Sequence, residues 1–380
     1  MPVQRFLINT PDATIHDLSE RLARSGFTTA TGQPWKAGTD PEYLRLLVHY
    51  WLNEFDWRAR EQELNSFPNF ITNLNGRQVH FIHVRAVPSD PPPMPLVLTH
   101  GWPSCFLEFL PLARRLTDPE SYGSDANDTF DIVIPSLPGF AFSDLPSDGI
   151  VTPPRIADLW KGLMTDVLGY QQFGAYGGDL GSHVTDFLGA LHPDHVLGVY
   201  THHPRLSPDL SKGPPPTPAE KAYLANRAAV SKDGQAYAAI QGTRPDTLAA
   251  GLIDSPVGLA AWIIEKYREW SDWSDEIESR FDKDTLLSII MLYWLTGSIG
   301  SSFRSYYHDN TVPQLPLVEV PAGITLTSED EGYPLEFALR TYADIRQWRV
   351  ASRGRHFLAL EEPERLAADL RDFFRPFRQR

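Results

Sequence analysis

Five residues in the middle of the chain have the types and spacing of a nucleophile turn. Gly177, Gly178, Asp179, Leu180 and Gly181 follow an apolar run and precede an amphipathic segment. Small residues around a central side chain allow a tight strand-to-helix turn that lifts this side chain above a sheet. A carboxylate that attacks an alkyl carbon forms an ester, which water can later open, whereas serine would form an inert ether. Asp179 therefore predicts a covalent reaction with an alkylating electrophile such as an epoxide or an alkyl halide.

An ester on Asp179 needs a base that activates water, and a late histidine lies in the right place along the chain. His356 follows the last strand-like run, in the segment RGRHF, where its side chain can reach over the carboxyl ends of a sheet. The order nucleophile, acid, histidine is that of α/β-hydrolases. The acid should lie in the loop after GITLT, which reads SEDE. Spacing alone leaves open which carboxylate of Glu329, Asp330 and Glu331 pairs with His356.

The run HGWP, residues 100–103, directly follows the apolar run PLVLT. This is the place along the chain where a second oxyanion donor arises in such folds. We expect the backbone N–H groups of Trp102 and Leu180 to form an oxyanion hole. They would stabilise the negative charge on the Asp179 ester carbonyl oxygen while water adds to it.

Short continuous apolar runs surround these residues and predict an α/β protein. The runs, separated by helix-length stretches, are PLVLTHGW, DIVIPSLPG, QFGAYGGD, VLGVYTH and GITLT. Such runs are typical of strands buried on both faces of a parallel sheet, with crossover helices between them. We therefore expect an α/β fold, with a mostly parallel central sheet and helices on both faces.

The pattern divides the chain into four segments. Residues 1–90 form an N-terminal extension expected to wrap the core, with two helices and a β-hairpin at Asn75-Gly76, a dipeptide suited to a type I′ turn. Residues 91–204 form the first part of the core. The Pro-rich linker SPDLSKGPPPTP then opens an inserted helical cap, residues 205–310, and the sheet pattern resumes over residues 311–380.

Charge balance and cysteine content limit the class of protein. The chain has 34 Lys and Arg residues against 48 Asp and Glu residues, a net charge of −14, so it lacks the excess of basic groups that binds phosphate backbones. Cys105 is the single cysteine, which excludes an internal disulfide and fits a reducing compartment. The longest apolar run is shorter than the roughly 20 residues that span a membrane. We expect a soluble, cytoplasmic protein with no nucleic-acid partner and no membrane span.

Several longer motifs resemble those of one enzyme family. They are PDATIHDLSERLA, the block YLRLLVHYWLNEFDWRAREQELNSFPNF with the hairpin after it, HGWP, YGGDLGS and the ending HF-x(3)-EEP. Together they resemble the microsomal-type epoxide hydrolases, α/β-hydrolases with a distinctive N-terminal extension, over nearly the whole chain. The resemblance implies that Asp179 is the nucleophile, His356 the base and Asp330 the acid, with Glu329 as the alternative acid.

The resemblance also implies a proton donor for the departing oxygen. In this family two cap tyrosines bind the epoxide oxygen, and a phenol suits this task because it can stabilise a developing alkoxide. The matching stretches are AYAAIQGTRPDT and YWLTGSIGSSFRSYYHDN. They point to Tyr237 and to Tyr306, which has Tyr307 as its neighbour. Leu180 departs from the family pattern, in which tryptophan commonly follows the nucleophile.

The predicted reaction is hydrolysis of an epoxide to a vicinal diol, without a cofactor or a metal. Histidine pairs such as His202 and His203 lack a cysteine or clustered acid at the spacing of a metal site. The alternatives are a haloalkane or haloacid dehalogenase, which Leu180 disfavours because a tryptophan there often binds halide, and a catalytically silent binding member. A homodimer is compatible with the sequence. A bulky, apolar epoxide is suggested by five cap aromatics, Trp262, Tyr267, Trp270, Trp273 and Trp294.

Overall fold

A nine-stranded sheet forms the centre of the protein, in the order β1-β2-β3-β5-β4-β6-β7-β8-β9. The computed structural model describes residues 2–29, 32–204, 210, 213–274 and 276–378. The strands are β1 Gln4–Arg5, β2 Asn69–Leu74, β3 Arg77–Val84, β4 Met94–Thr99, β5 Phe130–Pro135, β6 Phe173–Gly177, β7 Val196–Thr201, β8 Ala322–Leu326 and β9 Ile345–Val350. Strands β4 to β9 pair in parallel, and β1, β2 and β3 add antiparallel pairs at one edge. The expected mostly parallel sheet is confirmed.

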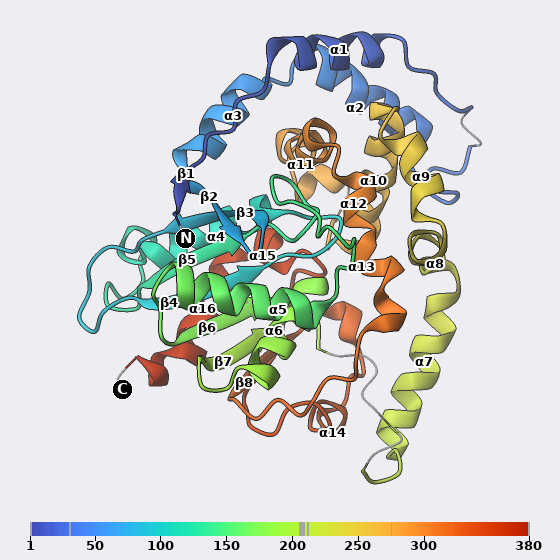
Figure 1. The fold of residues 1–380 in the computed structure, drawn as a ribbon. Coiled ribbons are helices and arrows are strands. Elements are labelled where there is room, and N and C mark those ends of the chain that lie inside the picture. The colour runs from blue at the N-terminus through green and yellow to red at the C-terminus, as the bar shows by residue number, and fades with distance from the viewer. Residues whose placement is uncertain (1, 30–31, 205–209, 211–212, 275, 379–380) are drawn as a thin grey trace.

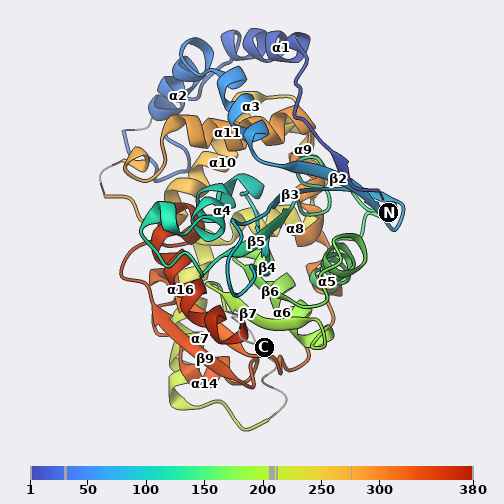
Figure 2. The ribbon, with the colours of Figure 1, turned by 90° about the vertical axis from the view of Figure 1, so that its left-hand side faces the viewer.

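Helices cover both faces of this sheet (Figures 1 and 2). One face carries α5 and α6, and the other carries α4, α15 and α16. Their bounds are α4 Leu110–Thr117, α5 Pro153–Gly162, α6 Leu180–Leu191, α15 Leu358–Glu361 and α16 Pro363–Phe374, and a short α14 covers Leu335–Ala338. Leu96, Val97 and Leu98 on β4 are all fully buried, because a strand covered on both faces has no side that meets water.

The N-terminal extension is divided between the sheet and the cap. Its hairpin, β2 and β3, turns at Asn75 and Gly76 with φ of 53° and 80°, the left-handed conformation expected of a type I′ turn. Its helices are α1 Asp12–Ala23, α2 Pro41–Asn53 and α3 Trp57–Ser66. These helices form an arch over α10 and α11 of the cap (Figure 1). The helices of the extension therefore cover the cap, and its strands join the core sheet.

Polar contacts fix this arch to the cap. The Tyr50 hydroxyl donates to Asp284 at 2.9 Å, and the Arg60 guanidinium donates to the Ser288 hydroxyl at 3.1 Å. Apolar side chains of α2, such as Leu47 and Trp51, are also buried. The extension thus holds the cap from the side opposite to the sheet.

The cap lies between β7 and β8, and the regular structure of its described residues is helical. Its helices are α7 Pro218–Gly234, α8 Ala236–Thr243, α9 Pro245–Leu252, α10 Pro256–Trp270, α11 Lys283–Thr296, α12 Ile299–Ser302 and α13 Arg304–Tyr307. The first half of the expected Pro-rich linker lies largely outside the described residues. Thr217 caps α7, because its hydroxyl accepts from the Glu220 N–H while the Glu220 carboxylate accepts from the Thr217 N–H.

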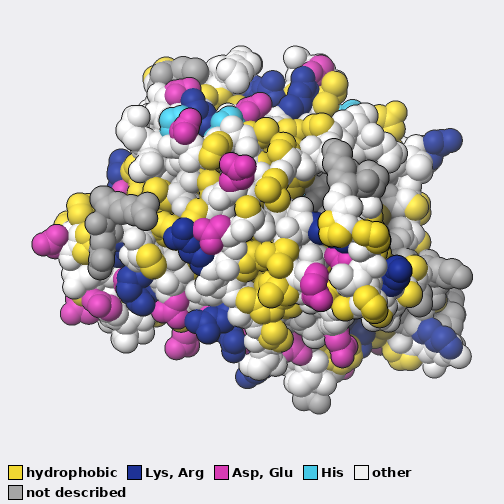
Figure 3. Space-filling view, turned by 90° about the horizontal axis from the view of Figure 1, so that it is seen from below, with side chains coloured by type: hydrophobic (Ala, Val, Ile, Leu, Met, Phe, Trp, Pro, Cys, Tyr) yellow, Lys and Arg dark blue, Asp and Glu magenta, His cyan; other side chains and the backbone are white. Residues whose placement is uncertain are grey.

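Two surface properties bear on possible partners. Among the described residues, no single helix is long and apolar enough to cross a membrane, although two bent helix pairs meet the criterion when each pair is taken together. Seen from below, the surface carries basic and acidic side chains side by side, with hydrophobic groups between them (Figure 3). The basic groups on this face do not gather into one patch.

Candidate active site

Asp179 occupies a strained turn between β6 and α6. Its φ of 52° and ψ of −127° lie outside the regions that L residues usually adopt. The flanking glycines make this turn possible, since an added Cβ would lie 2.1 Å from the Gly181 oxygen at Gly177 and 1.8 Å from the Thr99 oxygen at Gly181. A Cβ on Gly178 would lie 2.0 Å from the His202 ring. The sequence therefore dictates this turn through close backbone approach as well as through flexibility.

The HGWP loop holds the Asp179 carboxylate in place. The Trp102 N–H donates to Asp179 Oδ1 at 2.9 Å. Gly101 must lack a side chain, because a Cβ there would lie only 2.2 Å from the same oxygen. Leu180 is the first residue of α6, where a backbone N–H has no carbonyl partner inside the helix. One predicted oxyanion donor, Trp102, thus comes from the HGWP loop, and the other, Leu180, from the start of α6. The role of Leu180 stays a prediction.

The structure brings His356 to Asp179 as expected. His356 Nε2 lies 3.7 Å from Asp179 Oδ2 on one side of the ring, and Nδ1 lies 3.3 Å from Glu329 Oε2 on the other. Backbone contacts hold the loop, since the Glu361 carboxylate accepts from the N–H groups of Arg355 and Phe357, both at 3.1 Å. The His356 N–H donates to the carbonyl of Trp270, the last residue of α10, at 3.0 Å. The cap therefore helps to position the histidine loop.

The contact expected between Asp330 and His356 is corrected by the structure. Asp330 is 3% exposed, and its Oδ2 atom accepts from the Thr327 N–H at 2.9 Å. It therefore closes a capping box around the short turn Ser328–Asp330, while Glu329, the alternative named above, turns toward His356. A threonine followed three residues later by an acid is a known capping signal. This signal in TSED indicates that the Asp330 carboxylate caps the turn, which leaves the Glu329 carboxylate available to His356.

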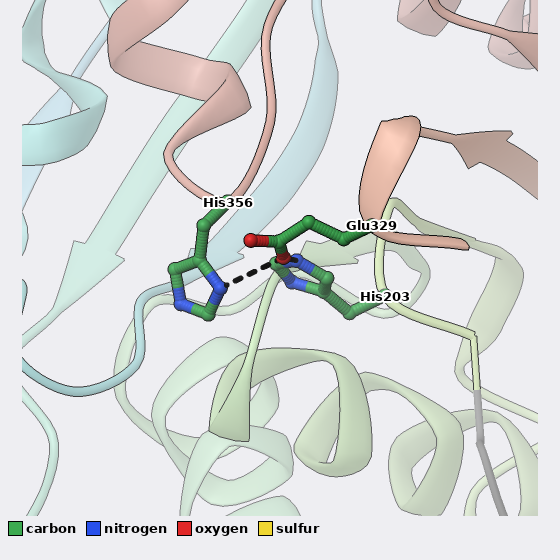
Figure 4. Close-up of side chains that lie close together, drawn as sticks. All are labelled: His203, Glu329 and His356. Atoms are coloured by element: carbon green, nitrogen blue, oxygen red, sulfur yellow. Dashed lines mark hydrogen bonds and ion pairs between the residues drawn. The ribbon is translucent and has the colours of Figure 1, made fainter. Parts of the chain in front are cut away.

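Two further histidines lie beside this pair, and His203 is the one that approaches Glu329 (Figure 4). The Asp179 N–H donates to His203 Nδ1 at 2.8 Å, and His203 Nε2 lies 3.4 Å from Glu329 Oε2. The Tyr176 hydroxyl donates to His202 Nδ1 at 2.7 Å, and His202 Nε2 donates to the His356 carbonyl at 3.0 Å. Sequence reasoning considered both histidines only as metal ligands. Their position directly after β7, beside the strand that carries the turn, was the signal that could have placed them here.

These contacts set the charges of the His356–Glu329 pair. Burial alone lowers the pKa of His356, but the hydrogen bond and charge of Glu329, together with the charge of Asp179, outweigh burial and raise the pKa to about 9. Burial raises the pKa of Glu329, but hydrogen bonds from His203 and His356 outweigh it and hold this pKa well below its usual range. At neutral pH the pair is therefore an imidazolium next to a carboxylate.

His203, Glu329 and His356 offer ligand atoms within 4.8 Å of one another, the residue types of a zinc site. The hydrogen bonds argue for a different arrangement. Because His203 Nδ1 accepts from the Asp179 N–H, the proton of the neutral ring is on Nε2, the nitrogen that faces Glu329. His356 likewise presents a protonated Nδ1 to Glu329. One hydrogen bond from His356 and one N–H of His203 at 3.4 Å face the same carboxylate, so both nitrogens carry protons and are not available as metal ligands.

Tyr237 and Tyr306 lie together above the HGWP loop. The Tyr237 ring stacks on the Trp102 indole with centroids 5.4 Å apart, and the Tyr306 ring meets the same indole edge-on at 5.9 Å. Tyr307 instead is 47% exposed, so the structure separates the two neighbours. Burial and the charge of Asp179 raise the pKa of Tyr237 and of Tyr306. Both phenols therefore stay protonated at neutral pH and can donate hydrogen bonds.

Aromatic packing and one buried cation hold these tyrosines. Trp270 contacts Tyr237 at 5.0 Å and His356 at 4.7 Å between ring centroids. The Lys266 ammonium lies 4.8 Å from the centre of the Tyr237 ring and 5.3 Å from that of Trp270, within the range of a cation–π contact. Of the five cap aromatics named from the sequence, Trp270 is the one with ring contacts to Tyr237 and His356.

The fold and this site define an α/β-hydrolase with a carboxylate at the nucleophile turn. Residues 3–109 match the family described as "Epoxide hydrolase N terminus", and residues 94–251 match "alpha/beta hydrolase fold". Epoxide hydrolase 1 of Sus scrofa is 35% identical over 402 residues, which cover 98% of this chain and 88% of that protein.

Solved structures agree with this match. The Aspergillus niger epoxide hydrolase superposes with a TM-score of 0.84 at 32% identity, covering 99% of this chain and 97% of that one. The juvenile hormone epoxide hydrolase of Bombyx mori superposes with a TM-score of 0.89 at 29% identity, covering 100% and 95%. The chain belongs to the epoxide hydrolase family. The predicted activity is confirmed, and the dehalogenase alternative is not favoured by these relatives.

Proposed function

We propose that this epoxide hydrolase opens its substrate through Asp179, with the cap tyrosines holding the oxygen. Asp179 Oδ2 attacks one ring carbon, the carbon–oxygen bond of the ring breaks, and Tyr237 and Tyr306 donate hydrogen bonds and a proton to the departing oxygen. The observation that carries the proposal is the Asp179 carboxylate held between the Trp102 N–H and His356, with both phenol rings packed on Trp102. Tyr306 faces this site, which supports it over Tyr307.

Ester formation then makes His356 a base. The charge of Asp179 helps to raise the pKa of His356 to about 9, and the ester on Asp179 carries no charge. The pKa of His356 therefore falls after ring opening, and the neutral ring can take a proton from water. Glu329 orients the ring and stabilises its charge, while the N–H groups of Trp102 and Leu180 stabilise the oxyanion on the Asp179 carbonyl. Release of the diol leaves the second proton of the water on Asp179, and return of that proton to the phenolate formed in ring opening restores both the Asp179 carboxylate and the phenol.

The substrate class follows from the side chains around the site. Trp102, Trp270 and Phe357 surround the reacting groups, and they offer apolar surface with few hydrogen-bonding groups. We infer a bulky, apolar epoxide, with aryl epoxides as the first choice.

We also infer action in the cytoplasm, since Cys105 is a free, buried thiol of the kind that a reducing compartment preserves. Cell fractionation tests this location.

The experiment that tests the chemistry is intact-mass measurement of the His356→Gln variant with aryl, terpenoid and aliphatic epoxides and small alkyl halides. The variant keeps Asp179 but loses the base, so we expect an adduct of the whole epoxide mass on the peptide that contains Asp179. His16→Gln is the matched control, because His16 is exposed on α1 and should turn over normally.

Each contrary result has a distinct meaning. An adduct that lacks the halogen would indicate a dehalogenase, and steady turnover by His356→Gln would remove His356 as the base. An adduct on a residue other than Asp179 would overturn the nucleophile assignment. Asp179→Ala should form no adduct with any of the compounds.

A further inference from the structure

Glu108 is a buried acid beside the active site that the chemistry above does not use. It lies on the short turn η1, Phe106–Phe109, directly after the HGWP loop. The side chain is 4% exposed, and burial raises the pKa of Glu108 to about 7. A carboxyl group in such surroundings is costly to bury unless a polar partner faces it. The charges of His356 and Asp179 act on this group, so the acid belongs to the electrostatics of the site.

A small cavity connects Glu108 to the reacting groups. It is lined by Glu108, Asp179 and His356, and its wall is completed by Gly101, Trp102, Ser104, Gly178 and Phe357. The space open to the centre of a water molecule is about 10 Å³, close to the minimum that one water needs. A water in this cavity would have both carboxyl groups and the imidazole as neighbours, which meets the need for two to four polar partners.

The orientation of His356 points the same way. Nδ1 is engaged by Glu329, and Nε2 lies 3.7 Å from Asp179 Oδ2, which is beyond hydrogen-bond distance. Nε2 is therefore the nitrogen that can take a proton from water in the second half of the reaction. Among the described residues it has no hydrogen-bond partner. A water that donates one hydrogen bond to Nε2 still needs an acceptor for its second O–H group. Besides Asp179, which carries the ester, Glu108 is the carboxyl group in the cavity wall that can accept it.

We propose that Glu108 is a catalytic residue of ester hydrolysis, where its carboxylate accepts one hydrogen bond from the water that His356 deprotonates. This inference rests on the proposed role of Asp179. The water oxygen forms a bond to the Asp179 carbonyl carbon, and its proton passes to His356 Nε2. The bond from that carbon to the product oxygen then breaks, and the oxygen takes the proton back from Nε2. Two contacts on the water fix the direction of attack, which is where positioning contributes to rate.

Ring opening consumes no water, whereas ester hydrolysis does. Loss of a contact to the water should therefore slow hydrolysis alone, whereas a structural defect should slow both half-reactions. In Glu108→Gln, we expect ester formation within about twofold of the wild-type rate and ester hydrolysis at least about tenfold slower. The ester should therefore accumulate, as seen by rapid-quench intact mass with an aryl epoxide. Asp369→Asn is the matched control. Asp369 is another buried acid, 8% exposed and with its pKa raised by burial, but it lies on α16 away from the cavity wall. Both of its rates should stay unchanged.

The contrary outcomes are distinct. Wild-type hydrolysis in Glu108→Gln, or an equal loss in both half-reactions, would overturn the role of Glu108. If Glu108→Gln does not fold, Glu108→Asp keeps the charge but withdraws it by one methylene, and hydrolysis alone should slow. An unchanged hydrolysis rate in that variant would also overturn the proposal. The proposed function fails separately, if His356→Gln, which retains Glu108, forms no ester on Asp179.

Discussion

The core and the cap hold their reactive groups by different means. On the core side, the Trp102 N–H donates to Asp179, and glycines surround it closely. A Cβ added to these glycines would clash with the Asp179 carboxylate or with the adjoining backbone. On the cap side, Tyr237 and Tyr306 are held by stacking on Trp102 and by the Lys266 ammonium. Backbone hydrogen bonds define a position to a few tenths of an ångström, whereas ring packing leaves room to slide.

The difference matches what each side must do. Attack on carbon and on the ester carbonyl needs fixed distances, so it depends on groups that do not move. Binding the oxygen of different epoxides needs donors that can adjust, and two phenols at one place can share this task. We therefore expect changes in the core to stop the chemistry and changes in the cap to slow only ring opening.

The largest effect is expected from Gly101→Ala. The new Cβ would lie 2.2 Å from Asp179 Oδ1 in the present structure, so the carboxylate must move. We expect turnover to fall by about 10²-fold to 10³-fold, because a shift of about 1 Å in a reacting group can cost 10²-fold. Steady-state diol formation measures it. Gly26→Ala is the control, since a Cβ there meets nothing within 4 Å, and near-normal turnover by Gly101→Ala would contradict the role of the HGWP loop.

The second-largest effect should distinguish the roles of two neighbouring acids, Glu329 and Asp330. Glu329→Gln should slow ester hydrolysis by about 10²-fold, because the His356 ring loses the charge that orients and stabilises it. Asp330→Asn should leave that rate nearly intact and instead lower the free energy of unfolding by about 1 kcal/mol, the usual value of a helix-cap contact. Single-turnover kinetics and urea denaturation measure the two quantities. The reverse pattern would restore Asp330 as the acid.

A smaller effect is expected from the cap. Tyr237→Phe should slow ring opening by about tenfold and leave ester hydrolysis unchanged, because Tyr306 still donates to the oxygen. The double variant Tyr237→Phe/Tyr306→Phe should lose considerably more than either single variant. Tyr307→Phe is the control, as this neighbour is exposed. If Tyr237→Phe also slowed ester hydrolysis, the separation between core and cap would fail.

The smallest effect is a change with pH in the fraction of enzyme that accumulates as the Asp179 ester during turnover. The pKa of His356 is raised to about 9 in the free enzyme, and it should be lower in the ester because the Asp179 charge is then gone. Hydrolysis needs neutral His356, so its rate falls as pH decreases through the lower pKa, while ring opening by the Asp179 carboxylate continues. We expect a several-fold larger fraction of ester at pH 5.5 than at pH 8.5 in quenched intact-mass spectra. Equal fractions would contradict this coupling.

Much of the site was readable from local patterns. The GGDLG turn, the HGWP run and the late histidine each depend on residues close in the chain, and the structure brings Asp179, Trp102 and His356 together as expected. The choice of acid was not resolved by order along the chain, although the capping pattern at Thr327 contained the answer. For His203 the position directly after β7 was the available signal, whereas the contact of Glu108 with the cavity next to Asp179 and His356 depends on residues distant in the chain.

The sequence by itself determined the fold and the reaction class and predicted the nucleophile, because strand periodicity, glycine placement and the choice of a carboxylate are local properties. Only the tertiary structure decided that Glu329 faces His356, that Tyr306 rather than Tyr307 faces Trp102, and that the extension holds the cap. Each of these depends on which side of a turn or helix meets a distant element. The direction of a side chain in a short turn is set by packing across the molecule, which neighbouring residues do not specify.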